Sequence, residues 1–202
     1  MGLTYANMSM SLDGFIAGPN VRVGNGMGDR GDDLHDWIFT GKSEAEIQAF
    51  MDEQFASVGA VLMGRTMLDV GIEPWGDEPP FHAPVFVVTH RPAERIVKAG
   101  GTTYTFVTDG PDAALRLARQ AAGDRDVRVE GGAAVVRQYL HAGALDELRL
   151  HVVPILLGGG VRLFADAADH PVTLTATGSV DGNGVAHLHC RVRTPSVELG
   201  QP

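Results

Sequence analysis

The sequence predicts an α/β domain with a mixed, mostly parallel central sheet, flanking helices and an antiparallel end at the C-terminus. Short apolar runs alternate with helical patterns over most of the chain, which is typical of parallel strands joined by helices. The pattern changes after residue 147, where alternating strands surround a turn sequence at residues 181–184. The chain has 202 residues, 44% of them hydrophobic and 20% charged, which suits one globular domain.

The N-terminal part starts with a predicted strand over residues 3–10, which a Gly- and Asp-rich irregular stretch follows at residues 12–36. A loop of this length is usually functional or mobile. Residues 43–46 form a capping box, so we expect a helix over residues 43–57. The apolar stripe of this helix consists of Ile47, Phe50, Met51, Phe55 and Val58.

Four more strands are predicted in the middle of the chain, at residues 60–63, 84–88, 104–107 and 127–129. A helix fits between the last two, because Pro111 and Asp112 suit its first turn and Gly123 suits its end. A second helix begins at residues 131–132. Its buried side is formed by Val135, Val136, Tyr139 and Leu140.

The C-terminal part is predicted to be antiparallel. A strand over residues 147–154 leads into a tight loop at residues 156–160, and strands over residues 172–177 and 186–192 form a hairpin. No repeat, low-complexity tract or charged linker divides the chain. We therefore expect a single domain over residues 1–202, with a core from about residue 3 to residue 193 and a short flexible C-terminal tail.

Composition argues against several classes of partner. The net charge of −9 disfavours sequence-independent binding to nucleic acid, which depends on Lys and Arg. Cys190 is the only cysteine, so neither an intramolecular disulfide nor a cysteine-rich zinc site is expected. His187 and His189 fall on one face of a predicted strand, but no third ligand can be named, and we interpret them as surface residues without a metal. The N-terminus carries no targeting signal and the composition is not that of a membrane chain, which predicts a cytoplasmic protein.

Three strand ends share features that suit a phosphate group. In open α/β sheets, ligands gather at the carboxyl ends of parallel strands. Glycines, hydroxyls, helix starts and arginines follow three of the predicted strands, at residues 64–66, 89–91 and 130–134. Arg65, Arg91 and Arg95 therefore stand where a dinucleotide would lie, in a chain that is otherwise acidic. The 2′-phosphate of NADPH explains such arginines, because one charge-assisted hydrogen bond of about 1.5–3 kcal/mol gives roughly ten- to hundredfold discrimination against NADH.

Five short segments together carry a resemblance to a known family. They lie at residues 11–18, 61–66, 88–91, 130–132 and 154–160, in the family's order. On these segments the chain resembles the dihydrofolate-reductase-like superfamily, in the branch related to the reductase domain of bifunctional riboflavin-biosynthesis enzymes. The resemblance covers nearly the whole length. It implies a mixed sheet whose last strand is antiparallel, NADPH as the cofactor, and a homodimer.

The resemblance also implies which residues surround the cofactor. Gly64, Arg65 and Thr66 match the first phosphate-binding turn, and Thr89, His90 and Arg91 match the surroundings of the 2′-phosphate and adenosine. The helix start under the pyrophosphate is matched by Gly131, Gly132, Ala133 and Ala134. Ile16 and Ala17 would lie near the nicotinamide.

A proton must accompany hydride transfer to a C=N or C=O group, and a pocket acid or a bound water supplies it. Asp13 is the first candidate acid, and Asp36 or Asp33 could serve instead, because the resemblance places them where folate reductases carry their pocket acid. The order Asp36-Trp37 departs from that of true folate reductases, which argues against dihydrofolate as the substrate.

The sequence thus favours an NADPH-dependent reductase of a small pterin-, pyrimidine- or related heterocyclic substrate. A non-catalytic ligand-binding member of the same fold is the alternative. A ribosylaminopyrimidine reductase of riboflavin biosynthesis ranks lower, because Arg22 and Arg30 are the only basic residues of the long loop that could hold its phosphate.

Overall fold

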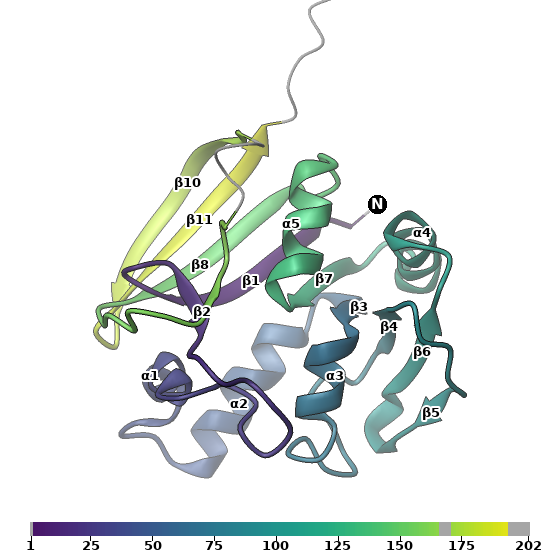
Figure 1. Ribbon diagram of the computed structural model, residues 1–202, viewed down its shortest axis with the longest axis horizontal. Coiled ribbons are helices and arrows are strands. Elements are labelled where there is room, and N and C mark those ends of the chain that lie inside the picture. The colour runs from purple at the N-terminus through teal and green to yellow at the C-terminus, as the bar shows by residue number, and fades with distance from the viewer. Residues whose placement is uncertain (1, 166–170, 194–202) are drawn as a thin grey trace, which may run out of the picture.

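Nine strands form one sheet in the computed structural model, which describes residues 2–165 and 171–193. The strands, from edge to edge, are β10 (Thr173–Gly182), β11 (Val185–Arg193), β8 (Glu147–Val153), β1 (Thr4–Ser11), β7 (Asp126–Gly131), β3 (Val58–Gly64), β4 (Pro84–Val88), β6 (Thr103–Val107) and β5 (Ile96–Val97). Figure 1 shows the β10–β11 hairpin at one edge of this sheet and β5 at the other. The expected flexible tail lies outside the described residues.

The six central strands are parallel, and the strands that flank them on the two sides, β11 and β5, are antiparallel to them. β8, β1, β7, β3, β4 and β6 pair in parallel, whereas β11 pairs antiparallel with β8, and β5 with β6. This confirms the predicted mixed sheet with an antiparallel C-terminal end. Residues 183 and 184 join β10 to β11, and Asn183 and Gly184 both have positive φ, 53° and 74°, as a two-residue hairpin turn with matching twist requires.

The helices cover both faces of the sheet. They are α1 (Asp36–Phe39), α2 (Glu44–Phe55), α3 (Arg65–Gly71), α4 (Pro111–Ala122) and α5 (Ala133–His141). Along β3 successive side chains point to opposite faces. Leu62 packs into the core beneath α4 and α5, and Val61 packs with Leu68 of α3 and Phe55 of α2 on the other face. A strand buried on both faces explains the continuous apolar run in this part of the sequence.

The predicted capping box of α2 is present, because the side chains of Ser43 and Glu46 accept hydrogen bonds from each other's backbone N–H groups. Two other details of the helices are corrected. Val58 begins β3 and does not belong to the stripe of α2, in which only Phe55 is buried. α3, which follows β3 directly, was not predicted. In the described part of the chain no helix is long and apolar enough to cross a membrane.

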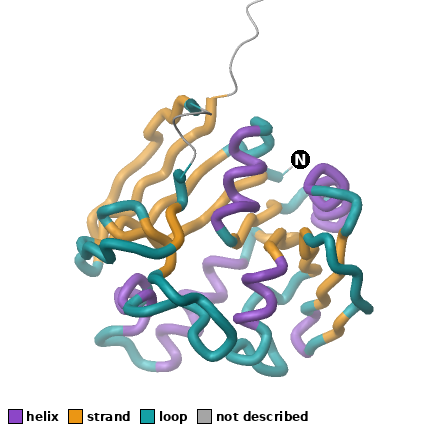
Figure 2. Tube along the Cα trace, in the orientation of Figure 1, coloured by secondary structure: helices purple, strands orange, loops and turns teal. Residues whose placement is uncertain are grey.

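The long loop after β1 is more ordered than the sequence suggested. It contains β2 (Phe15–Ala17), which pairs with β9 (Val161–Arg162), and a single 3-10 turn, η1 (Gly31–Leu34). Gly160 (φ +121°) lets the two segments approach, because a Cβ there would lie 2.1 Å from the carbonyl oxygen of Ala17. Figure 2 shows the remaining loop between β2 and η1 beside α3, and a Cβ built on Gly26 of this loop would lie 3.3 Å from Val70 of α3.

Candidate functional site

A cleft of about 1030 Å³ lies at the carboxyl ends of the parallel strands. Its walls come from the ends of β1, β3, β4 and β7, the starts of α3 and α5, and one side of α2. The loop between β2 and η1 contributes a further wall through Val21, Gly26 and Met27. Ligands of open α/β sheets bind at this end of the strands, so the cleft is the candidate functional site.

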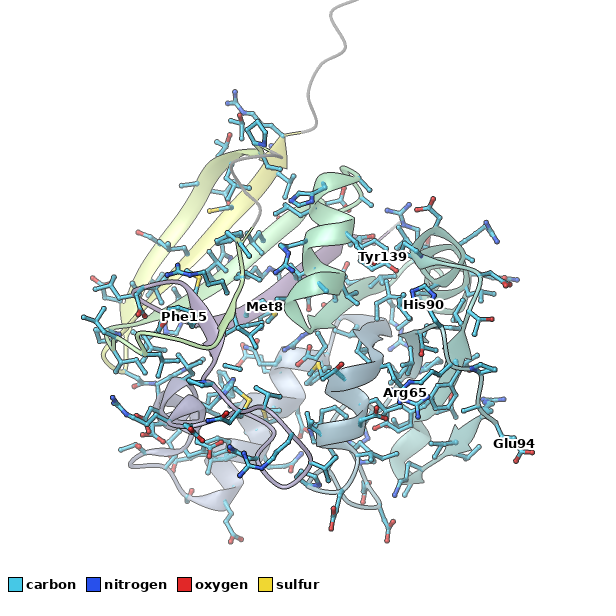
Figure 3. All side chains as sticks on the ribbon, in the orientation of Figure 1. Met8, Phe15, Arg65, His90, Glu94 and Tyr139 are labelled. Atoms are coloured by element: carbon cyan, nitrogen blue, oxygen red, sulfur yellow. The ribbon has the colours of Figure 1, made fainter. Side chains whose placement is uncertain are left out.

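The predicted cofactor residues come together in this cleft, with the exception of Gly131. The lining includes Ile16, Ala17, Gly64, Arg65, Thr66, Thr89, His90, Arg91, Gly132, Ala133 and Ala134. Figure 3 shows Arg65 and His90 on the β4 side of the molecule and Met8, which also lines the cleft, nearer to β1. The three segments that follow parallel strands, although far apart in sequence, therefore converge on one cleft. That they bind phosphate stays a prediction.

Arg65 and Arg91 share one acidic partner, Asp69. Arg65 Nε lies 2.6 Å from Asp69 Oδ1, and Arg91 Nη2 lies 2.7 Å from Asp69 Oδ2. Burial would raise the pKa of Asp69, but the hydrogen bonds from the two guanidinium groups hold it below its ordinary value. Asp69 therefore stays charged and keeps both arginines at the mouth of the cleft. The backbone N–H of Arg91 donates to Thr89 Oγ1 over 3.0 Å, which orders the turn after β4.

The N-terminus of α5 faces the same cleft. Gly132 is the N-cap and offers no side-chain oxygen, so no side chain caps the first turn of this helix. Ala133 is buried, whereas Ala134 is exposed, and both line the cleft. A helix start with small residues and a positive end of its dipole is suited to an anion.

At the other end of the cleft, the wall formed by strands β1 and β7 of the sheet carries polar side chains. Arg128 and Glu130 of β7 form an ion pair with 2.5 Å between Nε and Oε2, and Arg128 also donates to the carbonyl oxygen of Gln54. Asn7 of β1 donates to Gln54 Oε1 over 3.4 Å, and its own Oδ1 is buried and has no hydrogen-bond partner among the described residues. A buried acceptor without a partner beside a cleft is suited to a ligand donor.

Apart from Gln54, the side of α2 that lines the cleft is apolar. Phe50, Met51 and Phe55 line the cleft, and Phe50 and Met51 are only half-buried. Most of the predicted apolar stripe of the helix borders the cleft, which gives this end one polar wall and one apolar wall, as suits a flat heterocycle with polar edges.

Three side chains from neighbouring strands form a row at this end. Ser9 of β1, His151 of β8 and His187 of β11 are register partners. His151 Nδ1 lies 2.7 Å from His187 Nδ1, and Trp37 packs against both imidazole rings with centroid separations of 4.8 and 5.0 Å. Trp37 Nε1 donates to Ser9 Oγ over 3.3 Å. Burial, followed by the neighbouring His187, lowers the pKa of His151 to about 3, so the ring is neutral near pH 7.

The interpretation of His187 and His189 as two surface residues is corrected in part. His189 is exposed, but His187 is half-buried and pairs with His151. Within residues 2–165 and 171–193, no group of three potential ligands could hold a metal ion.

The two carboxylates predicted to be catalytic do not line the cleft. Asp13 accepts hydrogen bonds from Ser11 Oγ and from the backbone N–H groups of Leu157 and Gly158, at 2.6, 3.1 and 2.8 Å. The bond from Ser11, assisted by the two backbone bonds, lowers the pKa of Asp13. Its geometry is that of a carboxylate that fastens the loop after β1 to the loop after β8.

Asp36 and Asp33 have no place in the cleft lining either. Asp36 is exposed at the start of α1, and Asp33 pairs with Arg30 over 3.0 Å. The acids that do line the cleft are Asp32 and Glu130. Neither of them was among the predicted catalytic residues.

A polar pattern in the strands could have revealed this end of the site. Asn7, Ser9 and Ser11 alternate with apolar residues in the central strand β1, and Arg128 and Glu130 alternate with apolar residues in β7. Period-2 polar residues on a buried strand need partners, which can come from a ligand.

The family model of the RibD C-terminal domain matches residues 4–186 of this chain. A riboflavin biosynthesis protein RibD from Corynebacterium ammoniagenes is 41% identical over 59 residues, which are 29% of this chain and 16% of that protein.

Solved structures share the fold. A putative riboflavin biosynthesis protein from Shewanella sp. PV-4 superposes with a TM-score of 0.67 at 20% identity, covering 95% of this chain and 99% of that one. Dihydrofolate reductase from Enterococcus faecalis, solved with NADP(H) and the compound RAB-propyl, superposes with a TM-score of 0.55 at 14% identity, covering 96% and 98% of the two chains. The fold is therefore that of the dihydrofolate-reductase-like proteins, as predicted.

Proposed function

The chain belongs to the RibD C-terminal domain family, and from this premise we propose that it is an NADPH-dependent reductase of a small heterocyclic compound. The observation that carries the proposal is the convergence of Arg65, Arg91 and the uncapped start of α5 on one cleft. These groups offer two guanidinium forks and free backbone N–H donors to a phosphate-rich ligand. The reductase-type fold of the family agrees with this use of the cleft.

NADPH supplies a hydride when it is bound, and the residues of the cleft serve to hold the two reactants. In the proposal, the start of α5 and the turn around Gly64 bind the pyrophosphate, and Arg91 with Thr89 and His90 binds the 2′-phosphate and adenosine. Ile16 and Ala17, both buried, border the nicotinamide. Gly131 is not among the lining residues, so its contribution is limited to the shape of the turn before α5.

The substrate end is assigned to the polar wall of β1 and β7 and the apolar side of α2. Phe50 and Met51 offer contact area to the face of a ring, and the Glu130 carboxylate and Asn7 Oδ1 offer acceptors to its edge. A pterin, a pyrimidine or a related heterocycle has this combination of flat faces and N–H edges. No step is assigned to Asp13, Asp33 or Asp36, because none of them lines the cleft.

A ribosylaminopyrimidine substrate is less well supported. Arg22 and Arg30, the basic residues that could hold its phosphate, do not line the cleft, and Arg30 is paired with Asp33. A non-catalytic ligand-binding protein remains the alternative from another functional class. It would bind NADPH with the same residues but would not oxidise it with any of a panel of pterins, pyrimidines and quinones.

The deciding experiment is a parallel titration of the purified protein with NADPH and NADH. Tryptophan fluorescence and the melting temperature report binding, since a ligand of the folded state raises the melting temperature. Tight binding of NADPH with NADH at least about tenfold weaker supports the proposal. Binding of neither nucleotide contradicts it. With binding established, the decrease in nicotinamide absorbance tests candidate substrates.

A further inference from the structure

The His151–His187 pair links the cleft to the hairpin of β10 and β11. His151 lines the cleft, while its Nδ1 is turned to His187, which does not line it. The far nitrogen of His187, Nε2, lies 3.3 Å from the carbonyl oxygen of Gly182. Two imidazole rings and one carbonyl therefore form a continuous chain of hydrogen bonds that ends at the wall of the cleft.

The carbonyl group of Gly182 determines which atom is the donor in each of these hydrogen bonds. A carbonyl oxygen only accepts, so Nε2 of His187 carries a hydrogen and donates to Gly182. A neutral imidazole has one N–H, and Nδ1 of His187 is then an acceptor. The contact of 2.7 Å requires a donor on the other side, which is Nδ1 of His151. Nε2 of His151 consequently carries no hydrogen and can accept a hydrogen bond.

The surroundings of His151 keep its ring from taking up a further proton. Burial and the neighbours His187, Arg128, His189 and His35 all disfavour a positive charge on His151. Nε2 of His151 has no hydrogen-bond partner among the described residues, so its lone pair is free on the ring that borders the cleft. Trp37, which packs against both rings, holds them in place.

We propose that His151 is a specificity-determining residue whose Nε2 accepts a hydrogen bond from an N–H group of the heterocyclic ligand, with His187 as the positioning residue that fixes its tautomer. The ligand class is an aminopyrimidine or a fused ring with an amino or ring N–H at this edge. This inference rests on the proposed function, because it identifies the substrate class of the same cleft. A site that accepts from a ligand N–H rejects analogues without it, since its own acceptor would stay unpaired.

Nuclear magnetic resonance tests the tautomer without any ligand. In protein labelled with nitrogen-15, long-range proton–nitrogen correlations distinguish a protonated imidazole nitrogen from a bare one. The expected spectrum of His151 shows a protonated Nδ1 and a bare Nε2, and His187→Ala abolishes this preference. A protonated Nε2 on His151 in the unmodified chain, or the same tautomer in His187→Ala, overturns the assignment.

Ligand discrimination tests the recognition step. The probes are 2,4-diaminopyrimidine and 2,4-bis(dimethylamino)pyrimidine, which lacks N–H groups, and tryptophan fluorescence reports binding because Trp37 contacts His151. We expect a preference of at least about tenfold for the amino probe. His151→Leu should remove most of it, and His151→Gln, which restores an acceptor, should recover part. His189→Leu, at an exposed position of β11 two residues from His187, is the matched control and should keep the preference.

The two proposals fail in different ways. Titrations are done with and without NADPH. A preference for the amino probe without NADPH binding would refute the reductase proposal and leave this inference standing. NADPH binding with equal affinity for both probes, or with affinity for neither, would overturn the inference. A preference that persists in His151→Leu would be steric and would overturn it too.

Discussion

The guanidinium group of Arg91 contacts the carboxylate of Asp69 at 2.7 Å, and Arg65 contacts the same carboxylate at 2.6 Å. The single negative charge of Asp69 thus neutralises part of the positive charge of the two arginines, which would otherwise be available to a 2′-phosphate. The two arginines differ in freedom, because the side chain of Arg91 is 64% exposed and that of Arg65 is 25% exposed. Arg65 also packs over the ring of Phe106. Arg91 is therefore the better candidate for a direct phosphate contact, and Arg65 for holding Asp69.

Replacing Arg91 should lower the preference for NADPH. Arg91→Ala removes a charge-assisted hydrogen bond of about 1.5–3 kcal/mol, so NADPH affinity should fall roughly ten- to hundredfold while NADH affinity changes little. Fluorescence titrations with both nucleotides measure the two affinities. Arg95→Ala is the matched control, because Arg95 is an exposed arginine that follows the same strand and does not line the cleft. Equal losses for both nucleotides would place the 2′-phosphate elsewhere.

A carboxylate at the start of α5 should have opposite effects on stability and on binding. Ala134 is exposed near the N-terminus of this helix, where a negative charge stabilises by about 0.3–1 kcal/mol. Ala134→Glu should therefore keep or slightly raise the melting temperature. It should also weaken NADPH at least about tenfold, since the carboxylate repels the pyrophosphate. Ala134→Gln has nearly the same volume without the charge. If both variants bind NADPH alike, the pyrophosphate does not lie at this helix.

Most of the fold could be predicted because its signals are local. The capping box at Ser43 starts α2, and Asn183-Gly184 forms the hairpin turn, since each depends on residues a few positions apart. The pairing of β2 with β9 could not be predicted in this way. It joins segments separated by more than a hundred residues and depends on the close approach at Gly160, a tertiary contact without a local pattern.

The candidate site likewise has residues that a local pattern predicts and residues that only the tertiary structure brings together. The glycines, hydroxyls and arginines at strand ends could be found in the sequence because parallel strands bring their ends to one edge. Asp69 was missed because α3 was not predicted. Asp69 lies four residues after Arg65, a spacing that brings the two side chains together only in a helix. His151 and His187 become neighbours only through the register of β8 and β11, which the sequence alone does not determine.

Asp13 should affect the stability of the loops and leave cofactor binding unchanged. Its carboxylate accepts two backbone N–H groups of the loop after β8, and Asp13→Asn turns an amide donor toward one of them. A lower melting temperature with unchanged NADPH affinity is the expected result. Because the pKa of Asp13 is lowered in the fold, its stabilisation is present above the ordinary carboxyl pKa and is lost at more acidic pH. Loss of turnover at unchanged stability would return Asp13 to the catalytic candidates.

The neutral His151 ring should make the fold less stable as the pH falls. The pKa of this ring is the ordinary 6.5 in the unfolded chain, and burial, with the neighbouring His187, lowers it to about 3 in the fold. The unfolded chain therefore binds a proton that the folded chain does not. The stability that comes from the neutral ring is complete above pH 6.5 and is lost as the pH falls from 6.5 toward 3.

Urea unfolding at about pH 7.5 and about pH 5 measures this loss, which amounts to at most about 1.4 kcal/mol for each pH unit below the unfolded pKa. His151→Gln lacks the titrating ring, so its free energy of unfolding should change less between the two pH values. His189→Gln removes an exposed histidine that contributes only a minor part of the pKa shift of His151, and should retain most of the dependence. If His151→Gln loses as much stability as the unmodified chain, His151 is protonated in the fold. That result would also remove the bare Nε2 on which recognition of a ligand N–H depends.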